Sequence, residues 1–91
     1  MQEILKRIDR LIDICKNYVD EADHSQIVFE IQDLIYELYG INSIYATQFE
    51  TVAKSNNTNN QKSNFYVGIL NAIKNSLKRD TKFLLVQLIK I

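Results

Sequence analysis

Apolar positions recur at helical spacing through the first part of the chain. Over residues 2–19 the apolar side chains fall on one half of a helical wheel, and most charged side chains lie opposite. A second apolar stripe runs over residues 26–39. A period near 3.6 residues is typical of amphipathic helices that bury one face. The pattern therefore predicts two helices, and Asp23 or Ser25 in the polar segment between them can cap the second.

The segment YGINSIYATQF, residues 39–49, interrupts this pattern. It is either a ligand-binding corner or a tight connection between two helices. Gly40 stands where the left-handed backbone that closes a helix is expected, and Asn42 or Ser43 can cap the next helix. The end of one helix, a turn and the start of the next account for every residue of YGINS. We therefore expect a third helix over residues 43–54.

The segment KSNNTNNQKS, residues 54–63, contains no apolar residue and predicts a mobile loop. Ser63 is a suitable cap for a fourth helix over residues 64–78. Gly68 lies inside that helix, where glycine costs roughly 1 kcal/mol relative to alanine. We expect this cost to be offset by another backbone that packs closely against Gly68.

The last ten residues, KFLLVQLIKI, are apolar on every side of a helical wheel, and Thr81 can cap a fifth helix there. A helix that is apolar all round is usually buried. The segment is therefore expected to fill a central slot, to contact a partner chain, or to lead into a longer protein. Leu85 and Ile89 are its candidate interface residues.

Composition supports an all-α fold, a compact bundle of four to five helices in one domain over residues 1–91. The chain has no proline and two glycines, too few for the many turns of a sandwich or barrel. Its N-terminus lacks the apolar stretch of a signal peptide, and no apolar run approaches the roughly 20 residues that span a bilayer. The sequence predicts a cytoplasmic protein with no membrane partner.

Catalytic motifs are missing from the sequence. It has no glycine-rich phosphate loop, no nucleophile elbow and no HExxH motif. His24 is expected in a solvent-exposed turn and Cys15 on a buried stripe as an inert hydrophobe. One cysteine and one histidine cannot build a zinc site, and Asp9 with Asp13 offers too few oxygens for magnesium. We expect no catalytic, cofactor or metal site, so the protein is predicted not to be an enzyme.

Charge is unevenly placed although the net charge is zero. Residues 1–40 hold nine acidic and four basic side chains, whereas residues 41–91 hold two and seven, which gives −5 and +5. The halves are expected to attract each other within the fold or across a dimer. Four cations form a candidate basic patch: Lys74, Lys78, Arg79 and Lys82.

That patch, with Tyr45 and Tyr66 available for base stacking, makes nucleic-acid binding an alternative function. A solvated helix end, where cations complement the helix dipole, explains the same cations. Phe29 and Tyr36 are seven residues apart on a face outside the apolar stripe. Their helix is therefore either central to the fold or half of an interface, and both residues are candidate interface residues.

Two segments, YGINSIYATQF at 39–49 and FYVGILNAIKNSLKRD at 65–80, flank the polar loop. Together they resemble a helical module at the N-terminal side of prokaryotic anti-phage proteins, including abortive-infection and TIR-associated effectors. In that module an aromatic-Gly-x-x-Ser corner leads to a short helix that ends near a Phe, and a Phe-x-x-Gly-Ile/Leu helix follows. Often an effector domain comes next, whereas this sequence ends at Ile91.

The chain is therefore interpreted as the isolated module, a stand-alone relative or a phage-encoded mimic. The resemblance implies a non-catalytic module that holds protomers or partners together. Self-association is expected from the apolar C-terminal segment, the aromatic face of Phe29 and Tyr36, and the opposite charges of the two halves. The alternative is a small phage- or host-encoded inhibitor or nucleic-acid-binding protein.

Overall fold

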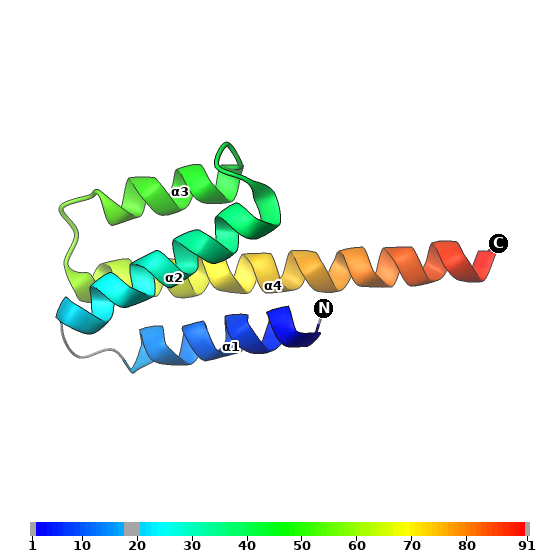
Figure 1. Cartoon of the computed structure of the whole chain (residues 1–91), viewed down its shortest axis with the longest axis horizontal. Coiled ribbons are helices and arrows are strands. Elements are labelled where there is room, and N and C mark those ends of the chain that lie inside the picture. The colour runs from blue at the N-terminus through cyan, green and yellow to red at the C-terminus, as the bar shows by residue number, and fades with distance from the viewer. Residues whose placement is uncertain (1, 18–20, 91) are drawn as a thin grey trace.

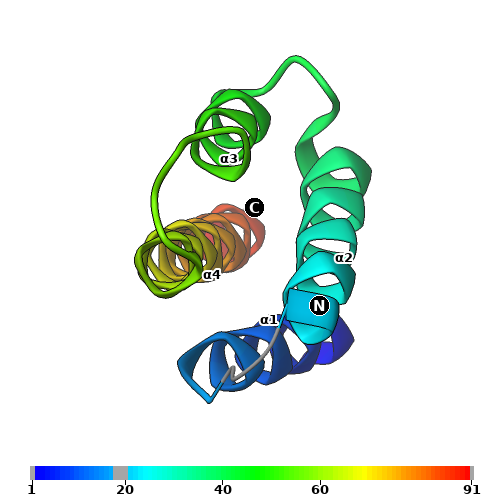
Figure 2. The same cartoon turned by 90° about the vertical axis from the view of Figure 1, so that its left-hand side faces the viewer.

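The computed structural model describes residues 2–17 and 21–90, and the side chains of residues 3–17 and 24–80. Its four helices are α1 (Gln2–Lys16), α2 (Glu21–Tyr39), α3 (Ile44–Ala53) and α4 (Asn59–Lys90). Consecutive helices run antiparallel (Figure 1), and seen end-on they surround a common interior (Figure 2). The predicted all-α bundle is confirmed, and no strand occurs in the described part of the chain.

The core is built from the inner face of each helix. Side chains from all four helices are fully buried there: Ile8, Leu11, Ile31, Leu34, Ile35, Phe49, Tyr66, Leu70 and Ile73. Those from α1, α2 and α4 recur three or four residues apart, as the sequence pattern predicts. Removing each large side chain from water contributes roughly 1.5–3 kcal/mol, which makes this interior the main stabilising feature of the bundle.

The corner between α2 and α3 has the predicted geometry. Gly40 has a φ of 85°, and its N–H donates to the carbonyl oxygen of Tyr36 at 3.0 Å. Ser43 then caps α3, since its hydroxyl oxygen accepts from the N–H of Ala46 at 3.1 Å. The left-handed glycine closes one helix and the serine opens the next, so the prediction of a helix end and restart is confirmed.

The start of α2 differs from the prediction. The helix begins at Glu21, so Asp23, His24 and Ser25 lie in its first turns and none of them occupies a polar linker. The segment DEADHS contains neither glycine nor proline, and Glu and Ala favour helix, so nothing in it ends the helix. One consequence is that His24 lies half-buried instead of in an exposed turn.

The start of α4 also differs from the prediction. Thr58 and Gln61 form a capping box, in which the Gln61 N–H donates to Oγ1 of Thr58 at 3.2 Å and the Thr58 N–H donates to Oε1 of Gln61 at 3.0 Å. The helix therefore begins at Asn59, inside the segment expected to be a loop. Ser63 lies buried within α4 and is not its cap.

The fourth and fifth predicted helices are one continuous helix. Thr81 does not start a new element, because the residues around it include no glycine or proline and the helix continues to Lys90. At 1.5 Å per residue, the 32 residues of α4 span about 48 Å, close to the 51 Å length of the molecule. Leu77 is its last core residue among the described side chains, and residues 78–80 are exposed.

The C-terminal turns of α4 project beyond the ends of the other three helices (Figure 1). The expectation of a central slot for residues 82–91 is therefore wrong for the helix as far as Lys90, and Ile91 lies outside the described residues. Gly68 is a further correction, because it is exposed and no atom lies within 4 Å of the position that a Cβ would occupy. No second backbone packs against it.

Candidate interaction surfaces

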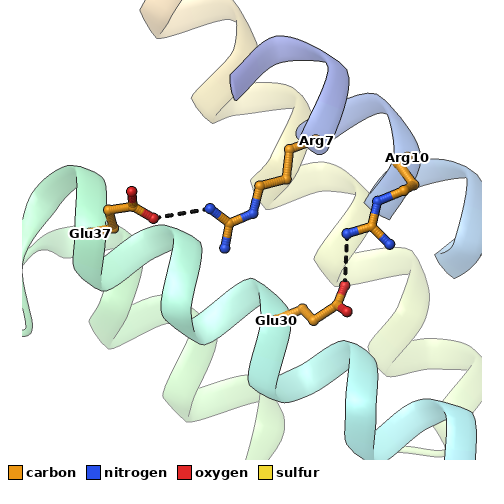
Figure 3. A network of polar contacts seen from close by, with 4 residues as sticks. All are labelled: Arg7, Arg10, Glu30 and Glu37. Carbon is orange, nitrogen blue, oxygen red and sulfur yellow. Dashed lines mark hydrogen bonds and ion pairs between the residues drawn. The ribbon is translucent and has the colours of Figure 1, made fainter. Parts of the chain in front are cut away.

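Ion pairs position α1 against its neighbours. Arg7 Nη1 lies 3.0 Å from Glu37 Oε2, and Arg10 Nη2 lies 3.2 Å from Glu30 Oε2, so two arginines on one face of α1 reach two glutamates of α2 (Figure 3). These side chains are partly exposed, and such pairs contribute about 0.2–1 kcal/mol each. Their value here is in fixing how α1 lies along α2.

A third ion pair joins the acidic and basic parts of the chain. Lys74 Nζ in α4 lies 2.5 Å from Asp9 Oδ1 in α1. The expected attraction between the two halves therefore exists within the fold at this contact. Lys74, one of the four cations of the candidate basic patch, is therefore already engaged in an ion pair.

The rest of that patch is only partly described. Lys78 and Arg79 are exposed, whereas the side chain of Lys82 lies outside the described residues. Of the two tyrosines expected to be available for stacking, Tyr66 is fully buried, and Tyr45 packs on Tyr39 with 4.8 Å between ring centroids. Tyr66 cannot stack on a base, because its ring is packed inside the core.

Tyr36 and Phe29 have separate roles. The hydroxyl of Tyr36 donates to a carboxylate oxygen of Glu50 in α3 and accepts from Nε2 of Gln32 at 2.8 Å. The hydrogen bond to Glu50, with a smaller contribution from burial, raises the pKa of Tyr36. Phe29 is instead 66% exposed. Of the two predicted aromatic interface residues, Phe29 is thus open to a partner, and the hydroxyl of Tyr36 joins α2 to α3.

A buried cluster lies where α1, α2 and α4 meet. Cys15 is buried, which raises the pKa of its thiol from 9.0 to about 11, and burial raises the pKa of Tyr66 from 10.0 to about 12. The ring centroid of Tyr66 lies 5.8 Å from that of His24 in α2 and 5.1 Å from that of Phe49 in α3. Cys15 is therefore a buried core residue, as predicted. Within the described residues, no group of three acidic, Cys or His side chains could hold a metal ion.

An apolar groove runs between α3 and α4. It has a volume of about 440 Å³ and is lined by Thr47, Gln48, Thr51, Val52, Phe65 and Ile69. Phe65 is 52% exposed beside it. The lining contains hydroxyl and amide groups but no acid, base or thiol, which suits contact with an apolar surface better than acid–base chemistry. The groove depends on two helices lying side by side, so no local sequence signal reveals it.

The end of the bundle from which α4 projects exposes large apolar side chains. The α2–α3 corner lies at this end (Figure 1), and Ile41 and Ile44 in it are 65% and 68% exposed. Glu3 and Lys6 of α1 are also exposed there, whereas Glu37 in the last turn of α2 is paired with Arg7. The candidate residues Leu85 and Ile89 belong to the projecting turns, and their side chains lie outside the described set. The structure thus gathers the corner and the projecting helix at one end and leaves Phe29 and the groove elsewhere.

The fold defines the protein as an all-α, four-helix bundle. No protein-family model, curated protein or solved structure matches the chain. Among the described residues, no helix is long and apolar enough to cross a membrane.

Proposed function

We propose that this chain is a non-catalytic helical interaction module that associates with copies of itself, and that it serves a prokaryotic anti-phage defence system. The observation that carries the proposal is the projection of α4. Six of residues 83–90 are large and apolar, and the other three helices end before the turns that hold them (Figure 1). A helix of this composition gains free energy when a partner covers it.

The surroundings support association over catalysis. The groove between α3 and α4 is lined by uncharged side chains, and the buried Cys15 is held as an unreactive thiol by its raised pKa. Phe29, Ile41 and Ile44 add exposed apolar area. The resemblance of residues 39–49 and 65–80 to a module of anti-phage proteins supports the assignment to defence.

Mass in solution tests the association. Light scattering at two protein concentrations is expected to give a mass above 10.6 kDa that rises with concentration. Replacing Leu85 and Ile89 with aspartate should return the mass to that of one chain while the helical circular dichroism is kept. A wild-type chain that stays at 10.6 kDa at the higher concentration rules out self-association.

Plaque formation tests the biological setting separately. Bacteria that express the chain are challenged with a panel of phages, beside cells that express the double aspartate variant. We expect the wild-type chain to alter plaque counts and the variant to have lost that effect. If the chain associates but affects no phage, the assignment to defence is wrong, whereas the proposal of an interaction module still holds.

A further inference from the structure

We infer that α3 opens as a unit, about hinges at residues 40–43 and 54–58, while α1, α2 and α4 stay packed together. The inference goes beyond the proposed function, because it concerns a motion within one copy of the chain. Its starting observation is the place of α3 in the bundle. This helix packs against α2 and α4 on the side away from α1 (Figure 2). Opening of α3 therefore leaves the contacts among the other three helices in place.

The buried part of α3 is small. Ala46 and Phe49 are its buried residues. Each of the other helices buries at least four apolar side chains, which in α1 are Ile8, Leu11, Ile12 and Cys15. Burial of apolar area is the main force that holds each helix in the bundle. The helix with the least buried area is the one expected to leave at the lowest cost, so α3 opens before the others.

Polar contacts between helices show the same difference. Two ion pairs join α1 to α2, and a third joins α1 to α4. Glu50 is the only charged residue of α3, and its carboxylate accepts a hydrogen bond from the hydroxyl of Tyr36 in α2. At the other end, Nζ of Lys62 in α4 donates to the carbonyl oxygen of Ala53 at 3.1 Å. Hydrogen bonds thus hold α3 where ion pairs hold α1.

The contact between α3 and α4 is incompletely filled. The groove of about 440 Å³ lies along this contact, with Val52 and Ile69 among its lining residues. Phe65 at its edge is 52% exposed, so α3 does not cover that ring. Atoms that face open space have fewer dispersion contacts than atoms in a filled interior. This side of α3 therefore adds less to its attachment than a close-packed contact does.

Both ends of α3 are suited to bending. Gly40 begins the corner at residues 40–43, and glycine adopts left- and right-handed backbone conformations at little cost. The other connection, residues 54–58, is KSNNT, which is mostly exposed and contains no apolar side chain. A few residues at the ends of an element are enough to absorb the backbone change of a hinge motion.

Opening changes the surface that the chain offers. The ring centroids of Phe49 and Tyr66 lie 5.1 Å apart in the closed bundle, and both side chains are buried. Movement of α3 separates the two rings and exposes the apolar sides of α2 and α4 that α3 covers. The open form thus has an apolar surface that the closed form keeps from water.

Native-state hydrogen exchange in low urea tests the opening. We expect the amides of residues 48–53 to exchange at least about tenfold faster than those of Leu70 and Ile73 in α4, with one shared urea dependence smaller than that of the α4 amides. Graded exchange without urea dependence means that α3 frays residue by residue. Exchange of α3 at the rate and urea dependence of Leu70 means that α3 leaves only on global unfolding. Either result overturns the inference.

Two variants separate this opening from global unfolding. Ile8→Val weakens the packing of α1, which the open form keeps, so exchange at Leu70 should rise roughly two- to tenfold while the α3 amides are unchanged. Tyr36→Phe removes the hydrogen bond between α2 and α3, which both openings break, so exchange should rise by one common factor of roughly two- to tenfold at both sets of amides. An equal effect of Ile8→Val on α3 and Leu70 overturns the inference. Both substitutions lie outside the projecting turns of α4, so neither result bears on self-association.

Discussion

Thr58 and Gln61 cap the start of α4 reciprocally, each side chain accepting a hydrogen bond from the backbone N–H of the other. Losing the Thr58 hydroxyl leaves one of the first N–H groups of α4 without its acceptor. We expect Thr58→Ala to lower the free energy of unfolding by about 1 kcal/mol. Urea unfolding followed by circular dichroism measures this change, and Thr58→Ser, which keeps the acceptor oxygen, should cost far less. Equal losses in both variants would mean that the hydroxyl does not cap the helix.

Gly40→Val should destabilise the bundle. The φ of 85° at Gly40 lies in the left-handed region, which costs a branched residue roughly 1–2 kcal/mol. No atom lies within 4 Å of the Cβ position, so the loss comes from backbone strain and not from a clash. Thermal unfolding measures it, and an unchanged melting temperature would contradict the role of Gly40 in closing α2.

Gly68→Ala should have the opposite sign. Gly68 lies inside α4 with an ordinary helical backbone and open space at the Cβ position. Alanine restricts the unfolded chain and suits the helix, so we expect a gain of about 0.5–1 kcal/mol in the free energy of unfolding. A loss of stability would show that the glycine has a role that its open surroundings do not suggest.

Tyr66→Phe should be neutral or stabilising at neutral pH. The hydroxyl of Tyr66 is buried and has no hydrogen-bond partner among the described residues. Leaving a buried hydroxyl unpaired costs roughly 1–3 kcal/mol, and phenylalanine keeps the ring contacts with Phe49 and His24 while removing that cost. A clear loss in chemical unfolding would imply that the hydroxyl has a stabilising contact.

Alkaline pH should destabilise the fold through Cys15 and Tyr66. Both are neutral acids whose pKa is raised by burial, from 9.0 to about 11 and from 10.0 to about 12. Their contribution is complete below pH 9 and falls as the pH rises toward 12, by up to about 1.4 kcal/mol per pH unit for each group. The free energy of unfolding measured from pH 8 to 11.5 should therefore decline less steeply in Tyr66→Phe. Identical slopes would show that Tyr66 does not contribute.

The sequence alone determined the elements that depend on near neighbours. The stripes of α1 and α2, the left-handed Gly40 and the Ser43 cap each follow from hydrogen bonds and side-chain spacing within about four residues, so a short window contains their cause. The Thr58–Gln61 capping box was equally local, and the pattern Thr-x-x-Gln could have revealed the start of α4. The asparagine-rich composition around it favoured a loop instead.

Only the tertiary structure decided which side chains meet. The Asp9–Lys74 pair spans 65 positions, and the hydrogen bond from Tyr36 to Glu50 links two helices whose relative rotation no local pattern encodes. The groove beside Phe65 and the projection of α4 also depend on how the helices are placed relative to one another. Amphipathic spacing predicts that a helix buries one face. Which helix packs against that face, and how much of the helix length is covered, depend on how all four helices pack together. The bundle ends where α1 and the α2–α3 corner end, and α4 continues because nothing in its own sequence stops it.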